Sequence, residues 1–318
     1  MESRNQRVWI VVFVVVALAC LAAIAAIALG VAWFLPVERE SVSIAAREGA
    51  RIDETFEVGS SFRLELYNVA GSVTVEAGDS GVVHLVATKR APLAADLDRI
   101  VVERSPTDGG LLIRTRRPAT LVNASVDFEI TVPPDTRLEL DTGAGNVEVR
   151  GLSGNVDVDT GSGNVELEDI AAAVDAHSGS GSMTVRGCAG PVRVDTGSGN
   201  IEVQDTGGDL DAHTGSGNIR VRDGTGRARL DTGSGSIRYE GSPSDECRFE
   251  TGSGSITLEL PDDLGVEIDL ATGSGDIDVE FDVAGQVSRR EVRGTIGDGS
   301  QGSIDAQTGS GDIDVVRR

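Results

Sequence analysis

Aromatic residues are scarce in this chain of 318 residues, which contains 7 Phe, 2 Trp and 2 Tyr. A large hydrophobic core usually depends on aromatic rings that each bury about 150–250 Å². The interior must therefore be built from small aliphatic side chains, which argues against a large enzyme domain with a single core. Both Trp, Trp9 and Trp33, lie in one apolar segment near the N-terminus, so none remains elsewhere to form an aromatic platform for sugars.

Positive charge is also in short supply. Lys and Arg number 28 against 51 Asp and Glu, which gives a formal net charge of −23, and Lys89 is the single lysine. Nucleic-acid binding needs Lys and Arg for phosphate contacts. The composition therefore predicts no nucleic-acid partner.

Charged residues are absent from residues 8–35. The run exceeds the roughly 20 residues that a transmembrane helix requires, and Trp9 and Trp33 would lie about 36 Å apart, near the two membrane interfaces. Arg4 and Arg7 precede it. The positive-inside rule then predicts a cytoplasmic tail at residues 1–7, one transmembrane helix at residues 8–35, and a C-terminal body outside the cytoplasm. The predicted localisation is the cell membrane, as a single-pass protein.

A cleaved signal peptide, with lipid attached at Cys20, is the alternative for this segment. The apolar run continues to Leu35, much further than a signal peptide requires. An uncleaved anchor is therefore favoured. Residues 36–55 are polar and are predicted to be a linker.

An internal repeat dominates the rest of the chain. The pentapeptide Thr-Gly-Ser-Gly-Asn, or a close variant, recurs mostly every 18 residues. Its copies begin at Thr142, Thr160, Ser178, Thr196, Thr214, Thr232, Thr251, Thr272 and Thr308. The last interval equals two periods. A repeat at a fixed period indicates an array of stacked units.

Each period holds two halves of nine residues in which apolar and polar residues alternate, as in Val156-Asp157-Val158 and Val165-Glu166-Leu167. Such alternation predicts short strands, and the Gly-rich segments between them predict turns. Nine residues cannot hold a crossover helix, so the strands must stack as coils. The predicted fold class is all-β: a parallel β-solenoid with 18-residue coils, right-handed by the usual rule, preceded by one transmembrane helix.

The β-rich body has two predicted parts. Residues 56–140 form a less regular N-terminal part of the solenoid, and residues 141–318 form the regular repeats. In the regular part, equivalent turn residues should form columns. Stacked Asn amides, such as Asn146 and Asn164, are expected to hydrogen-bond along the axis.

Several segments resemble a known bacterial family. They are Leu64–Val75 (LELYNVAGSVTV), Ala87–Arg90 (ATKR), Val126–Pro133 (VDFEITVP) and the TGSGN repeats. The family is a candidate adhesin domain of unknown function, found on membrane-anchored envelope proteins. The resemblance covers residues 56–318 and implies a β-solenoid at the envelope surface. It implies no catalytic residues.

A ladder of His and Asp is the first candidate site. It occupies one repeat position in adjacent coils, about 4.8 Å apart. Its members are His177, Asp195, His213 and Asp231. Interleaved His would relieve repulsion between the carboxylates, so the ladder is a candidate for weak divalent-metal binding or a pH response. The alternative is a solvated acidic edge.

A belt of arginines between acidic ends is the second candidate site. It comprises Arg220, Arg229, Arg238 and Arg248. A basic belt on an acidic protein could bind an anionic envelope polymer. The alternative is surface charge that keeps the solenoid soluble.

Other chemistry is disfavoured. A calcium β-roll needs an Asp where this repeat has apolar residues such as Ile277. Cys188 and Cys247 are expected roughly 14 Å apart, too far for a disulfide. No nucleophile, base and orienting residue converge, so the sequence predicts no enzyme and no cofactor.

The predicted function is therefore a membrane-tethered, non-enzymatic scaffold for adhesion or interaction in the bacterial envelope. Its expected partners are the membrane itself and envelope polymers or other surface proteins. One alternative is an accessory protein for envelope stress or signalling that senses a ligand or ions. Another is a β-helix enzyme that acts on polysaccharides.

Overall fold

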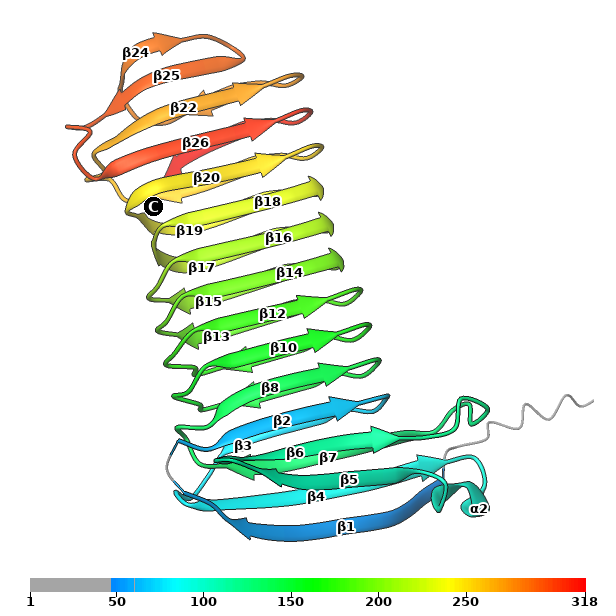
Figure 1. Ribbon diagram of the computed structural model, residues 1–318. Helices are drawn as coiled ribbons and strands as arrows, with labels where there is room; N and C mark the ends of the chain where they lie inside the picture. Colours follow the sequence, from blue (N-terminus) through cyan, green and yellow to red (C-terminus); the bar gives the residue numbers. More distant parts are fainter. Residues whose placement is uncertain (1–46, 60) are drawn as a thin grey trace, which may run out of the picture. The chain divides into compact units, whose positions relative to one another are not determined.

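The computed structural model describes residues 47–59 and 61–318, which belong to one unit, Ala45–Arg318 (Figure 1). The predicted cytoplasmic tail, the predicted transmembrane helix (8–35) and residues 36–46 of the predicted linker lie outside the described residues. Within the described ranges, no helix is both long and apolar enough to cross a membrane.

Two β-sheets enclose the core. Sheet A has 13 strands in the spatial order β1-β4-β7-β3-β9-β11-β13-β15-β17-β19-β21-β27-β23. Their bounds are β1 Arg47–Glu57, β3 Val73–Ala77, β4 Val82–Ala91, β7 Ser125–Val132, β9 Val147–Arg150, β11 Val165–Glu168, β13 Met183–Cys188, β15 Ile201–Thr206, β17 Ile219–Gly226, β19 Ile237–Pro243, β21 Ile256–Leu260, β23 Ile277–Val279 and β27 Ile313–Arg317.

Sheet B has 14 strands in the order β24-β25-β22-β26-β20-β18-β16-β14-β12-β10-β8-β2-β6-β5. Their bounds are β2 Arg63–Asn68, β5 Val101–Thr107, β6 Gly110–Arg116, β8 Arg137–Thr142, β10 Val156–Thr160, β12 Val174–Ser178, β14 Val192–Ser198, β16 Leu210–Ser216, β18 Ala228–Ser234, β20 Asp245–Thr251, β22 Val266–Thr272, β24 Val283–Val287, β25 Glu291–Ile296 and β26 Gly302–Thr308. A short helix, α2 (Ala94–Leu97), precedes β5.

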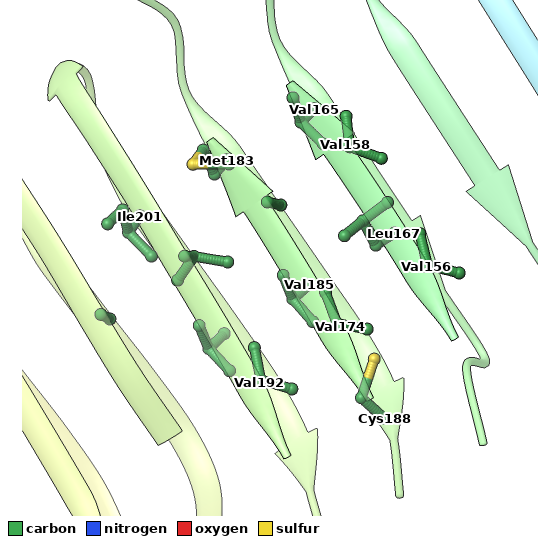
Figure 2. Close-up of a cluster of buried hydrophobic side chains, with 14 of the residues drawn as sticks. Val156, Val158, Val165, Leu167, Val174, Met183, Val185, Cys188, Val192 and Ile201 are labelled. Atoms are coloured by element: carbon green, nitrogen blue, oxygen red, sulfur yellow. The ribbon is translucent and has the colours of Figure 1, made fainter. Parts of the chain in front are cut away.

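The middle of the stack confirms the parallel solenoid with 18-residue coils. Each coil gives one strand to each sheet, and Val156 of β10 pairs in register with Val174 of β12. Inward apolar side chains from both sheets interdigitate, as Figure 2 shows for Val158, Leu167 and Val185, each at most 1 % exposed. The interior is one continuous cluster of mostly aliphatic residues, and its three largest fully buried side chains are the aromatic Phe128, Tyr239 and Phe249.

The C-terminal coils are not stacked in sequence order. The last coil, β26 and β27, inserts between β20/β21 and β22/β23. Ile304 of β26 pairs with Cys247 on one side and with Ile268 on the other. The antiparallel strands β24 and β25 then cover the outer edge of β22. The double interval before Thr308 therefore contains this antiparallel pair rather than another regular coil.

The N-terminal end is built in the same way, with one coil inserted out of sequence order and with antiparallel strands at the edge. The coil of β2 and β3 lies between the coil of β8 and β9 and the coil of β6 and β7. Antiparallel strands close this end, with β4 and β1 on sheet A and β5 on sheet B.

The predicted linker is wrong for residues 47–55, which form most of β1. Ile52 and Phe56 of β1 pack against the core although they are only partly buried. With only two such positions, the segment shows too little alternation to be recognised as a strand from the sequence alone.

Turn residues lock adjacent coils together. The Asn column exists, but its hydrogen bonds differ from the predicted amide stack. The Oδ1 atom of Asn164 accepts a hydrogen bond from the backbone N–H of Ser182 at 2.9 Å, and Asn146 accepts likewise from the backbone of Asn164 at 3.1 Å. The ladder therefore joins side chain to backbone.

Candidate functional site

Outward side chains on sheet B form two parallel columns, because every second residue of a strand points away from the core. We call them column 1 and column 2. Column 1 contains Asp157, Asp175, Arg193, Asp211, Arg229 and Arg248, on β10, β12, β14, β16, β18 and β20. Column 2, two residues further along the same strands, contains Asp159, His177, Asp195, His213, Asp231 and Glu250.

The predicted His and Asp ladder is the centre of column 2. Its four members occupy four adjacent strands in register. His213 Nδ1 lies 3.7 Å from Asp231 Oδ2, and His177 Nε2 lies 3.0 Å from Asp175 Oδ1 in column 1. In the part of the chain that the structure describes, no group of three or more His, Cys, Asp or Glu side chains is placed to hold a metal ion. Metal binding by the ladder stays a prediction.

The acidic part of sheet B includes carboxyl groups with altered pKa values. Partial burial, reinforced by the nearby Asp175, raises the pKa of Asp157. Partial burial and the adjacent Asp159 raise the pKa of Asp141. The folded state therefore disfavours the ionised form of both carboxyl groups, although both residues are exposed.

The predicted arginine belt is divided between two faces. Arg220 and Arg238 are neighbours in register on β17 and β19 of sheet A. Arg229 and Arg248 are neighbours on β18 and β20 of sheet B. Because the two sheets lie on opposite sides of the core, the four arginines cannot contact one ligand as a single cluster.

The sheet A arginines border two shallow clefts. One, of about 200 Å³, is lined by Arg220, Arg222 and Arg238 together with Val221 and Glu240. The other, of about 380 Å³, extends from the same Arg220 and Arg238 towards the Asn column. Because both clefts are lined by Arg220 and Arg238, we refer to them together as the sheet A cleft.

The charges in the sheet A cleft are only partly neutralised. Arg222 Nη1 lies 3.0 Å from Glu202 Oε1, and Arg238 contacts Glu259. Arg220 is exposed and makes no ion pair with any described residue. The cleft therefore offers one uncommitted guanidinium beside a second one, an arrangement that suits a carboxylate or phosphate group.

A longer groove of about 680 Å³ runs along the solenoid axis on sheet B. Column 1 forms one side of it, and the residues two positions before column 1 form the other, namely Asn155, Ala173, Pro191, Asp209, Arg227 and Glu246. The side chains of Ala173 and Pro191 are short, so the groove is low there. The next two residues on this side, Asp209 and Arg227, have longer side chains and form an ion pair, with Arg227 Nη2 2.8 Å from Asp209 Oδ2.

This groove was not among the predicted sites, although the sequence contains a signal for it. Ala173 and Pro191 are short residues at a repeat position that elsewhere holds long or polar ones, such as Arg137 and Arg227. Arg193 and Arg229 in column 1 are exposed and have no ion-pair partner among the described residues.

The two described cysteines belong to the core. Cys188 and Cys247 are buried, free and on different sheets, which confirms that they form no disulfide. Burial raises the pKa of both thiols, so they remain protonated at neutral pH.

Comparison with known proteins identifies one family model. The model described as Toastrack DUF4097 matches residues 63–316. No curated protein matches the chain.

The solved structures that match this chain include three with low superposition scores. They are a candidate cell adhesion protein from Clostridium sporogenes (13 % identity, TM-score 0.25, 85 % of this chain and 100 % of that chain covered), a candidate adhesin from Bacteroides fragilis (13 %, 0.38, 84 % and 97 %) and a candidate adhesin from Parabacteroides merdae (10 %, 0.28, 84 % and 97 %).

Proposed function

The chain belongs to the Toastrack DUF4097 family, and from that premise we propose that it is a non-enzymatic, membrane-tethered scaffold outside the cytoplasm that binds an anionic envelope polymer. Two features of the sequence support the tether: the uncharged run of residues 8–35, and Arg4 and Arg7 on its N-terminal side. The long stack of coils, with antiparallel strands at its N-terminal end and on the outer edge of β22, supports the scaffold role.

One observation carries the polymer-binding part: the uncommitted Arg220 next to Arg238 in the sheet A cleft. The solenoid is strongly acidic overall, so an unpaired guanidinium has many carboxylates nearby and still faces solvent. Such a group can form charge-assisted hydrogen bonds with an incoming anion without first breaking an ion pair. A polymer with repeated carboxylates or phosphates could occupy the two connected parts of the cleft.

A binding experiment tests this assignment. The full chain in zwitterionic detergent is titrated with an oligogalacturonate and, separately, with inorganic polyphosphate. We expect binding that weakens as salt increases, and at least about a tenfold loss, equivalent to about 1.4 kcal/mol, in the Arg220→Gln/Arg238→Gln variant. The matched control, Arg99→Gln/Arg289→Gln, removes the same charge from two exposed ion pairs and should bind normally.

The same titration separates binding from catalysis. If the oligogalacturonate keeps its chain length after prolonged incubation, the scaffold assignment stands, whereas shortening would support the polysaccharide-acting alternative. Equal affinity of both double variants would refute the sheet A cleft as the anion site.

The tether is tested in spheroplasts, which lack the outer layers of the envelope but keep an intact cytoplasmic membrane. An epitope after Arg318 should be accessible to antibody without lysis of the spheroplasts, and the chain should remain in the membrane fraction after a high-salt wash. Removal of residues 1–35 should release it. An epitope that becomes accessible only after lysis would contradict the proposed orientation.

A further inference from the structure

We propose that the outer face of sheet B binds the same face of a second copy of this chain, with the two solenoid axes antiparallel. Self-association of this kind is separate from polymer binding, because it uses sheet B rather than the sheet A cleft. The proposal depends on the order of charges in column 1, on the shape of the groove, and on the composition of column 2.

The charges of column 1 are complementary to their own reverse order. From β10 to β20 the column reads Asp157, Asp175, Arg193, Asp211, Arg229, Arg248. A two-fold axis parallel to the strands, between β14 and β16, places β10 of one copy opposite β20 of the other. Arg193 then faces Asp211 of the second copy, Asp175 faces its Arg229, and Asp157 faces its Arg248. Each contact occurs twice, so all six rows join opposite charges.

The charge order also selects this register over its neighbours. A shift of the two-fold axis onto β14 would bring Arg193 against Arg193 of the second copy. A shift onto β16 would bring Asp211 against Asp211. Beyond the six rows, Glu139 would face Asp305. Both are carboxylates that already pair with an arginine of their own copy, Arg63 and Arg248 respectively, so these rows add no attraction and the contact is limited to its centre. Opposite charges at the centre and like charges at the margins specify one alignment.

The groove supplies shape complementarity about the same axis. The two-fold operation places Asp209 of one copy over Pro191 of the other, and Arg227 over Ala173. The ion-paired ridge of Asp209 and Arg227 can therefore sit over the low part of this side of the groove, where the side chains of Ala173 and Pro191 are short. Because the interface is isologous, this fit also occurs twice.

Column 2 follows the same symmetry in its four central rows, whereas Asp159 in its first row would face Glu250 in its last, a contact between like charges. Asp195 faces His213 of the second copy, and His177 faces its Asp231. These are the four residues that the sequence analysis singled out as a ladder. Their alternation, which does not create a metal cluster within one chain, gives each central carboxylate a hydrogen-bonding partner across the interface.

The expected contact is modest in area. Six strands at about 4.8 Å spacing, with about 20 Å of strand length, give roughly 500 Å² per copy, near the lower limit for a specific interface. Pairing should therefore be weak in solution and become effective when many copies are displayed together. Antiparallel axes place β1, the N-terminal strand, at opposite ends of the pair.

A charge-reversal experiment tests the pairing. Self-association of the full chain is measured by sedimentation equilibrium in zwitterionic detergent. Arg229→Asp should weaken it at least about tenfold, because it creates two contacts between like charges. Asp175→Arg should do the same. The combined Asp175→Arg/Arg229→Asp variant should restore association to within about twofold, since each reversed residue again faces its opposite.

The double variant distinguishes loss of pairing from loss of folding and from other arrangements. Restoration shows that the single variants fold and that residues 175 and 229 face each other between copies. A double variant as weak as the single ones, or a native chain that stays monomeric at the highest concentration reached, would overturn the proposal. The matched control, Arg220→Asp on sheet A, reverses the same charge and should leave association unchanged while impairing polymer binding.

A cross-linking experiment tests the antiparallel geometry directly. In a Cys20→Ala background, chains with Asp175→Cys are mixed with chains with Arg229→Cys and exposed to mild oxidant. The mixture should form a disulfide-linked dimer, whereas each variant alone should not, since equivalent positions lie three coils apart. Efficient cross-linking of either variant alone would contradict the antiparallel register.

Discussion

The Thr196 hydroxyl donates a hydrogen bond of 3.0 Å to the carbonyl oxygen of Gly181, which lies in the neighbouring coil. The same bond recurs from Thr214 to Gly199 and from Thr232 to Gly217. These threonines are buried, so each hydroxyl satisfies a carbonyl oxygen that water does not readily reach. The repeat thus places a buried hydroxyl group, from Thr or from Ser178, at a position where composition alone would suggest only a polar turn.

Removal of this hydroxyl should destabilise the solenoid. Thr196→Val keeps the shape but leaves the Gly181 carbonyl without its side-chain donor, and we expect a loss of about 1–2 kcal/mol in the free energy of unfolding. Thr160→Val is the matched control, because the buried Thr160 hydroxyl has no hydrogen-bond partner. This second variant should be neutral or more stable. Urea denaturation of both proteins gives the comparison, and equal losses would contradict it.

The fourth residue of the repeat should accept no side chain. Gly181 has a φ of +149°, and a Cβ atom there would lie 2.0 Å from the carbonyl oxygen of Gly163. Gly181→Ala must separate two coils or distort the turn, and we expect a loss of about 3 kcal/mol or more. Gly207→Ala, where the nearest atom would be 3.5 Å away, should change stability by less than about 0.5 kcal/mol. Thermal unfolding of the two variants tests the difference.

The Asn ladder should tolerate loss of its amide nitrogen. Asn164 acts through its Oδ1 acceptor, so Asn164→Asp should retain the bond to Ser182 and remain near native stability. Asn164→Ala should lose about 1 kcal/mol. The chain supplies a precedent, since Asp312 accepts the equivalent bond from the backbone of Asp276 at 2.9 Å. If Asp and Ala were equally destabilising, amide-to-amide stacking would be the better description.

The sequence was a good guide wherever the 18-residue period persists. Alternation at positions such as Val156 and Val158 is set by local burial, and it predicted both strands of each regular coil. The period carries no information on the spatial order of coils. Insertion of β26 between β20 and β22 depends on long-range strand pairing, such as that of Ile304 with Cys247. Because the coils are nearly identical in sequence, they can stack in several spatial orders, and the repeat alone does not select one.

The candidate sites show the same limit. Register placed His177, Asp195, His213 and Asp231 together, as spacing predicted. The arginine belt was divided because successive halves of a coil belong to opposite sheets. The groove depends on a contrast in side-chain size between Ala173 and Arg227, which has meaning only after these residues are aligned along the axis.

Truncation of the last coil should unfold more than its own residues. Residues 302–318 lie between two other coils, so their removal leaves β22 without the parallel neighbour that it contacts at Ile268. We expect hydrogen exchange to accelerate throughout residues 266–296. A shorter deletion, of residues 316–318, retains Ile313 and Val315 and should preserve the protection of residues 266–296 from hydrogen exchange. If residues 266–296 stay protected after the larger truncation, the inserted order of coils is wrong.

The carboxylates of the acidic end should make stability depend on pH, with a sign opposite to that of an ion-paired carboxylate. The pKa of Asp157 is raised by partial burial and by Asp175, so its ionised form is less favourable in the folded state than in the unfolded state. The resulting penalty is absent below the unfolded pKa and appears as pH rises through the folded pKa. Asp157→Asn should therefore raise the melting temperature at pH 7 and have little effect near pH 3.

Asp276 is the matched control, because its hydrogen bond to Arg289 lowers its pKa. Asp276→Asn should lower the melting temperature at pH 7, and this effect should persist until the pH falls through the lowered folded pKa of Asp276, because the stability from an ion-paired carboxylate is lost only there. Melting temperatures of the three proteins across this range test both signs, and a destabilising effect of Asp157→Asn at pH 7 would show that the carboxylate is stabilised rather than penalised in the folded solenoid.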